Sequence, residues 1–148
     1  MTTVTLAPTA PPIADSRAGS RAARWGGRVL SGTVIAFCLL DSAMKIPPLQ
    51  PVTDTMAALG WPSDPATARS LAALLIGAAL LYAYRPTAIF GAVLMTGYLG
   101  GAVATHARIG SPLLSHALFG VYVGILAWGG LWLREPRLRA LLPFARRR

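Results

Sequence analysis

Charged residues are scarce in this sequence of 148 residues. Asp, Glu, Lys and Arg make up 13% of it, and only five residues are acidic. Soluble domains carry about 25% charged residues, so the chain lacks about half of the charge that a water-exposed surface needs. Its single cysteine, Cys38, excludes an intramolecular disulfide, a CxxC thiol pair and a thiolate metal cluster. We interpret Cys38 as a buried apolar residue.

The sequence contains long apolar runs. Hydrophobic residues make up 54% of the chain, and they gather in four segments, at 26–45, 66–84, 86–106 and 113–133. A bilayer core about 30 Å thick needs roughly 20 helical residues, and each segment comes close to that length. The second and fourth segments lack the polar stripe that a helix of a soluble bundle shows every 3.6 residues. The sequence predicts an all-α protein, a four-helix transmembrane bundle.

The connections predict an up-down arrangement. Arg85-Pro86 joins the second and third segments so tightly that the two helices must be antiparallel neighbours. Residues 46–65 form the longest loop, in which the prolines of PPLQP and WPSDP are expected to break any helix. Asp64, just before Pro65, is expected to cap the second segment.

The two ends of the chain differ in composition from its middle. Residues 1–24 are rich in Thr, Ala, Pro, Ser and Arg, which predicts a disordered cytoplasmic tail. A secretory signal fits them poorly, because the apolar run that follows is too long and no clear small-x-small cleavage site ends it. We assign residues 25–143 to the membrane domain and residues 144–148 to a basic C-terminal tail.

The basic residues predict the orientation. The net charge is +9, with 14 Lys and Arg, of which eleven share a side with both termini and three (Lys45, Arg69 and Arg108) lie opposite. Because basic residues concentrate on the cytoplasmic side, both termini of this multi-pass cell-membrane protein are expected in the cytoplasm. Nucleic-acid binding needs basic residues clustered on a folded, water-exposed face. These basic residues flank apolar runs instead, so the expected partner is the lipid bilayer and not nucleic acid.

This orientation brings polar residues together at the extracytoplasmic end of the bundle. Asp41 and Lys45 are four residues apart, in the order that favours an intrahelical ion pair. An acid inside a membrane helix needs a partner and by default indicates function, and Lys45, Arg108 and a protonated His106 are the candidate partners. A structural ion pair and ordinary polar residues at the helix ends are the alternatives. The candidate site comprises Asp41, Lys45, His106, Arg108, Ser115 and His116, with Tyr98 and Tyr122 lining the space beneath.

The sequence gives little support for a metal or haem site here. Asp41, His106 and His116 are suitable ligand types, but two His ten residues apart with a proline between them match no spacing signature. We therefore predict no metal, and a bis-His haem is disfavoured because both His lie at the membrane edge. The tryptophans are interpreted as interfacial anchors, namely Trp25, Trp61, Trp128 and Trp132.

Glycines four residues apart predict close helix packing. Small residues on one helix face let neighbouring backbones approach closely. The motifs are Gly97-x-x-x-Gly101, extended by Gly100 and Gly91, and Gly120-x-x-x-Gly124. We expect the third and fourth segments to pack tightly against each other or against a partner chain, which includes a second copy in a homo-oligomer.

The stretch at residues 98–142, YLGGAVATHARIGSPLLSHALFGVYVGILAWGGLWLREPRLRALL, resembles the signature half of the DoxX-like family of small four-helix membrane proteins. LLDSAMKIPP is similar to the acid-x-x-x-Lys helix end of that family, so the resemblance covers residues 26–143. It implies a four-helix bundle. The departure is Gly120, where relatives commonly have proline. The matching positions are Asp41, Lys45, Gly100, Gly101, His106, Arg108, Ser115 and His116.

The family name descends from a subunit of a thiosulphate:quinone oxidoreductase, so the resemblance implies an association with membrane redox complexes. Our first hypothesis is a redox-associated subunit that binds a quinone head group or a small anion at the polar end. There His106 would exchange a proton, and Arg108 or Lys45 would stabilise negative charge. The electron carrier must be bound or belong to a partner subunit, so the sequence does not decide whether the chain is an enzyme. The alternative is a non-catalytic scaffold, or a small-molecule binding or transport protein, with a structural polar cluster.

Overall fold

The part of the chain that the structure describes is built from helices. It is a computed structural model that describes the backbone of residues 13–141 and the side chains of residues 21–138. No strand occurs within residues 13–141, which confirms the all-α prediction. The helices are α1 (Ile13–Lys45), α2 (Gln50–Ala58), α3 (Pro65–Ala83), α4 (Ala88–Arg108), α5 (Phe119–Arg134) and α6 (Pro136–Leu141), with a 3-10 turn at Arg85–Thr87 and a π turn at Leu113–Ala117.

Four helical stretches are long and apolar enough to cross a membrane. They are Arg21–Lys45, Pro65–Ala83, Arg85–Arg108 and Leu113–Arg134, and they match the four predicted spans. Between 28% and 33% of each apolar stretch is buried inside the protein, so most of its surface faces outward. Apolar surface of this extent must be covered, and a bilayer is the cover that helices of this length fit.

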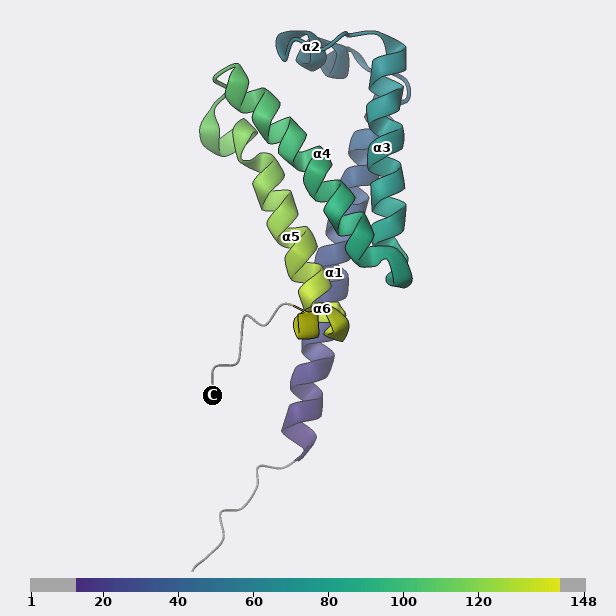
Figure 1. The fold of residues 1–148 in the computed structure, drawn as a ribbon, viewed down its shortest axis with the longest axis vertical. Helices are drawn as coiled ribbons and strands as arrows, with labels where there is room; N and C mark the ends of the chain where they lie inside the picture. The colour runs from purple at the N-terminus through teal and green to yellow at the C-terminus, as the bar shows by residue number, and fades with distance from the viewer. Residues whose placement is uncertain (1–12, 142–148) are drawn as a thin grey trace, which may run out of the picture.

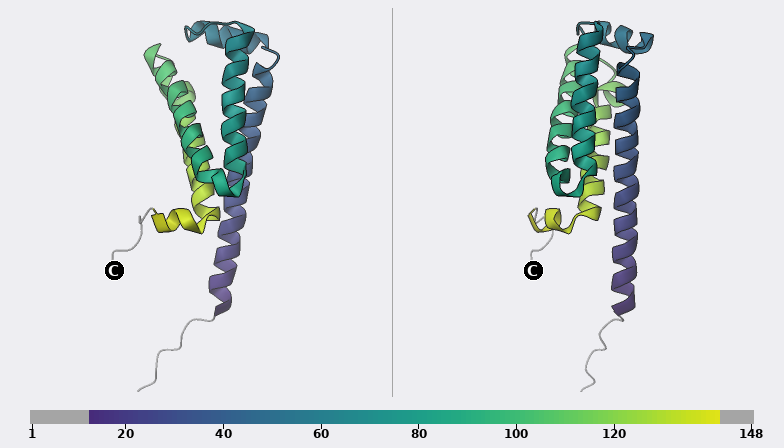
Figure 2. Two further views of the ribbon diagram at one scale, coloured as in Figure 1. Left: turned by 45° about the vertical axis from the view of Figure 1, so that its right-hand side comes forward. Right: turned by 90° about the vertical axis from the view of Figure 1, so that its right-hand side faces the viewer.

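The four long helices form an up-down bundle that opens toward one end. α1 packs against α3 and α5, and α4 packs against the same two helices. Figures 1 and 2 show that α1 and α3 diverge from α4 and α5 toward the end where α2 crosses the bundle. They converge toward the end where α6 lies. We call these the α2 end and the α6 end.

Glycines bring the helices into backbone contact toward the α6 end. A Cβ atom on Gly91 would lie 2.2 Å from the backbone N of Tyr82, so α4 touches α3 directly. A Cβ atom on Gly27 would lie 2.8 Å from the carbonyl O of Gly130, which brings α1 against α5. Small residues permit such close approach between membrane helices, and these three glycines therefore close the bundle at this end.

Tyr82 joins three helices in the same region. Its hydroxyl donates to the carbonyl O of Ala127 on α5 (2.7 Å) and lies 2.9 Å from the hydroxyl of Ser31 on α1. The guanidinium of Arg134 lies over the tyrosine ring, 4.7 Å from its centroid, and donates to the Tyr82 carbonyl O (2.6 Å). Polar groups in a region without water need protein partners, and these bonds supply them while fixing α1, α3 and α5 together.

Two helical segments lie where the sequence predicts none. Residues 13–24 belong to α1 and not to a disordered tail. Their Ala and Arg residues favour helix, and turns added to an existing helix avoid the cost of nucleation. Residues 50–58 form α2 inside the predicted loop, because Pro51 lies in the first turn, where its missing N–H costs no hydrogen bond. The tail predictions for residues 1–12 and 144–148 lie outside the described residues.

Asp64 caps α3, as the sequence predicts. Its carboxylate accepts from the backbone N–H groups of Ala66 (2.9 Å) and Thr67 (3.0 Å) and from the hydroxyl of Thr67 (2.7 Å). The hydrogen bond from the Thr67 side chain is the main cause that lowers the pKa of Asp64 from its ordinary value. This cap starts α3 immediately after the loop that follows α2.

The glycine motifs pack helices at two of their six predicted positions, which are Gly91, described above, and Gly120. A Cβ atom on Gly120 would lie 2.9 Å from the carbonyl O of Leu99, so Gly120 brings α5 against α4. At the other four glycines, Gly97, Gly100, Gly101 and Gly124, a Cβ atom would meet no atom of the described residues within 4 Å. Within one chain the packing prediction is therefore wrong for these four. Packing against a partner chain stays a prediction.

Candidate functional site

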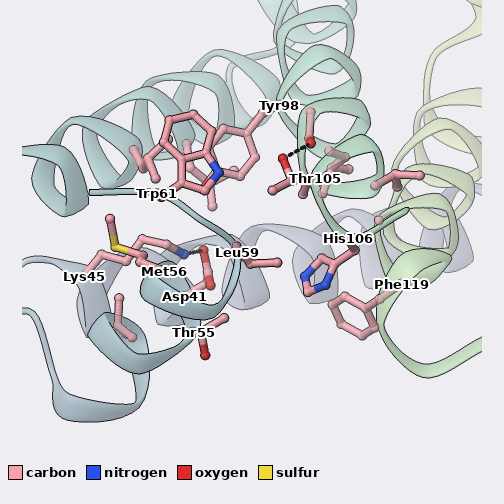
Figure 3. A pocket seen from close by; sticks show the side chains of 18 of the residues that line it. Asp41, Lys45, Thr55, Met56, Leu59, Trp61, Tyr98, Thr105, His106 and Phe119 are labelled. Carbon is pink, nitrogen blue, oxygen red and sulfur yellow. Dashed lines mark hydrogen bonds and ion pairs between the residues drawn. The ribbon is translucent and has the colours of Figure 1, made fainter. Parts of the chain in front are cut away.

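The diverging helices enclose a cavity of about 540 Å³ at the α2 end. Residues from all four long helices and from α2 line it, and Figure 3 shows the side chains. On α4, Gly97 and Gly101 line the cavity without filling it, since neither carries a side chain. Pockets that bind small molecules have volumes of about 300–1,000 Å³, so the cavity has the size of a ligand site.

Apolar and aromatic side chains make up most of the cavity wall. The rings of Phe37 on α1 and Phe119 on α5 meet edge to face, with centroids 5.3 Å apart. Tyr98 on α4 and Trp61, in the loop before α3, add two further rings to the wall. Flat apolar molecules pack well against aromatic rings, so this wall suits a ligand with a planar, mostly apolar body.

The Asp41–Lys45 ion pair faces this apolar space. Lys45 Nζ and an Asp41 carboxylate oxygen bond across one turn of α1, as the spacing predicts. Their side chains are 14% and 32% exposed, respectively, so the pair is only partly hydrated. Figure 3 shows both beside Thr55 and Met56 of α2. Because each charge neutralises the other, the pair offers hydrogen-bond donors and acceptors without net charge.

Two histidines approach each other at the edge of the same cavity. The rings of His106 on α4 and His116 on the π turn lie 5.8 Å apart, centroid to centroid. The Nδ1 atom of His106 is 3.0 Å from Ser111 Oγ, and that of His116 is 2.7 Å from Ser115 Oγ. Such contacts fix the orientation of an imidazole ring. Within the described residues no hydrogen bond is made to either Nε2 atom, so both remain available to a ligand.

Arg108 lies outside the cavity and holds α2 in place. Its guanidinium donates to the carbonyl O of Leu59 (2.6 Å), the C-cap residue that follows α2, and it does not pair with Asp41. Arg69 of α3 holds the start of the same connection through the carbonyl O of Ile46 (3.1 Å). Met56 is the buried residue of α2. The two arginines therefore contribute much of what keeps α2 over the cavity.

The structure divides the predicted site residues into two groups. The members that line the cavity are Asp41, Lys45, Tyr98, His106 and His116. Arg108 holds α2, and Ser115 is exposed and orients His116. Tyr122 is 42% exposed on α5 and is not among the lining residues, so its predicted place beneath the polar cluster is wrong.

Several lining residues were not predicted from the sequence. Trp61 lines the cavity, although its position beside a span indicated an interfacial anchor. Met56 and Val52 reach the cavity from α2, a helix that the prolines concealed. Their spacing of four residues, one helical turn, was the available signal. Within residues 21–138, no three His, Cys, Asp or Glu side chains come together as metal ligands, and Asp41, His106 and His116 do not form such a set.

Together these features define a small four-span membrane protein with a ligand-sized cavity at one end of its bundle. The chain belongs to the DoxX-like family, whose family model matches residues 29–130. The matched range contains the ion pair, both histidines, all of α3 and α4, residues 29–45 of α1 and residues 119–130 of α5. No curated protein and no solved structure matches the chain.

Proposed function

We propose that this DoxX-like protein is a redox-associated membrane subunit that binds the head group of a quinone in the cavity at its α2 end. The observation that carries the proposal is a cavity with aromatic walls and a few polar groups facing it. A quinone has a planar apolar ring and two carbonyl oxygens that accept hydrogen bonds. Such a molecule needs an apolar slot with donors placed at its rim.

The residues that would hold the head group have different roles. His106 and Lys45 are the donors for the quinone carbonyl oxygens, and Ser111 keeps the His106 ring in place. Asp41 holds the side chain of Lys45 along α1 through the ion pair. Phe119 and Tyr98 pack against the ring. A bound quinone supplies two-electron, two-proton redox chemistry, and the electrons come from a partner subunit.

A small anion fits this site less well than a quinone. Asp41 neutralises Lys45, and Arg108 is bound to the Leu59 carbonyl outside the cavity. An anion would therefore face mostly apolar walls and a carboxylate, which costs free energy unless a positive charge is present. The proposed orientation follows the distribution of basic residues: the α6 end lies in the cytoplasm with both termini, and the cavity opens at the extracytoplasmic end.

Binding of a short-chain quinone to the purified protein tests the proposal. The probe is decylubiquinone, and the signal is the quenching of tryptophan fluorescence, because Trp61 lines the cavity. We expect saturable quenching that Trp61→Phe largely removes. His106→Leu, which has no donor, should raise the Kd about tenfold, which corresponds to about 1.4 kcal/mol and to the loss of one hydrogen bond in an apolar site.

Tyr122→Phe is the matched control, since Tyr122 is an aromatic residue of the same bundle outside the cavity. It should bind decylubiquinone as the unchanged protein does. Equal binding by His106→Leu and the unchanged protein would contradict the proposal.

A scaffold with a structural polar cluster is the second candidate, favoured by the purely structural bonds of Arg108 and Ser115. It predicts that Asp41→Asn and His106→Gln lose function only in proportion to their loss of stability. A variant that stays fully folded and no longer binds quinone would exclude it.

A further inference from the structure

The cavity reaches the side of the bundle between α3 and α4. Among its lining residues on α4, Gly97 and Gly101 are exposed, whereas the others are buried or partly buried. No atom of the described residues lies within 4 Å of a Cβ position on either glycine. Figures 1 and 2 show α3 and α4 diverging along this half of their length. The two glycines therefore mark a side opening and not a helix contact.

Packed residues border the cavity between α1 and α5, between α4 and α5, at the α2 end and toward the α6 end. The Phe37–Phe119 ring contact closes the side between α1 and α5. Gly120 lies against Leu99, which closes the side between α4 and α5. Met56 of α2 is buried and closes the α2 end of the bundle. Toward the α6 end, α3 and α4 meet at Gly91.

The depth of the glycines places this opening among lipid acyl chains. α4 ends at Arg108, so Gly101 lies seven residues and Gly97 eleven residues from its end (108 − 101 and 108 − 97). At 1.5 Å per residue these positions are about 10 and 16 Å from the helix end. The hydrocarbon core is about 30 Å thick, so both glycines border hydrocarbon and not water.

We propose that the ligand is a lipid-phase quinone with a long apolar tail, whose tail passes over Gly97 and Gly101 into the bilayer while its head group occupies the cavity. This inference rests on the proposed function and adds the tail to it. A side opening at hydrocarbon depth suits a molecule that arrives from the lipid. The absence of a side chain at two positions one turn apart gives a chain-like group room to cross α4.

The test compares two probes that share a head group. One is ubiquinone-8, which carries an isoprenoid tail, and the other is ubiquinone-0, which carries none. Both are titrated against the protein in lipid nanodiscs, with quenching of Trp61 fluorescence as the signal. The variants are Gly97→Leu/Gly101→Leu and the single substitution Gly101→Leu, which fill the opening with side chains. The matched control is Gly100→Leu, since Gly100 is also exposed and free of close neighbours but does not line the cavity.

We expect the double variant to bind ubiquinone-8 at least tenfold more weakly and ubiquinone-0 within twofold of the unchanged protein. Gly101→Leu should show a smaller loss in the same direction, and Gly100→Leu should bind both probes normally. Unchanged ubiquinone-8 binding by the double variant overturns the inference. Equal loss of both probes also overturns it, since that result marks a filled head-group cavity. If the unchanged protein binds ubiquinone-8 and ubiquinone-0 with equal affinity, this inference is wrong and the proposed function stands. If the unchanged protein binds neither probe, both are wrong.

Discussion

Tyr82→Phe should destabilise the α6 end of the bundle. The helices that diverge at the α2 end are held together there. The substitution removes a hydroxyl that donates to the Ala127 carbonyl and contacts Ser31, and it leaves the ring in place under Arg134. Interhelical hydrogen bonds in membranes contribute about 0.6 kcal/mol on average and about 1.7 kcal/mol at most. Since two bonds are lost, we expect the free energy of unfolding to fall by about 1–3 kcal/mol.

The assay is reversible unfolding of the purified protein by SDS in mixed micelles. Ser31→Ala should cost less than Tyr82→Phe, and the double variant should cost less than the sum of the two. The difference should be about 0.5–1.5 kcal/mol, because both substitutions remove the same bond. Tyr122→Phe, at an exposed position, should stay within about 0.5 kcal/mol of the unchanged protein. A neutral Tyr82→Phe, or strict additivity with Ser31→Ala, would refute the reasoning.

Three further predictions follow from the α2 end and from the termini. Arg108→Gln should loosen α2, so that amide hydrogen exchange within residues 50–58 becomes about tenfold faster, while Arg137→Gln leaves it unchanged. Equal exchange rates in both variants would contradict the role of Arg108 in holding α2. The folded state holds the pKa of Asp64 below its unfolded value of 3.8, so its cap stabilises α3 fully above that value and loses this effect as the pH falls through the folded pKa. Thermal unfolding at pH 6 and pH 3 should show this loss for the unchanged protein and a smaller loss for Asp64→Asn; identical losses would argue against it. In a cysteine-free background, Ala58→Cys should react with an impermeant maleimide on intact cells, and Arg85→Cys only after permeabilisation; the reverse pattern would overturn the orientation.

The sequence predicted those features that depend on local patterns. Apolar runs of membrane-spanning length gave the four helices, and a spacing of four residues gave the Asp41–Lys45 pair. The Asp64-Pro65 sequence marked the start of α3 for the same reason, since a helix cap involves only neighbouring residues. The resemblance to the DoxX-like family was confirmed because its motifs lie within these local segments.

The features that the sequence did not predict depend on how helices lie in space. Arg108 binds a backbone carbonyl 49 positions away, and a backbone acceptor has no signature in the side-chain sequence. Gly97 and Gly101 fit a packing motif, but the spacing of the motif does not reveal whether a neighbour lies opposite it. Here α3 and α4 diverge, so the motif borders a cavity. α2 was missed because its proline was interpreted as a breaker and not as a first-turn residue.

Native mass spectrometry of the protein, gently solubilised from its membrane, tests the central claim most directly. We expect the protein to carry one bound quinone, which His106→Leu/Lys45→Met sheds and Tyr122→Phe keeps. The same spectra should contain the redox partner subunit. Quinone absent from the unchanged protein, or kept equally by all three proteins, would contradict the claim that the cavity at the α2 end is a quinone site.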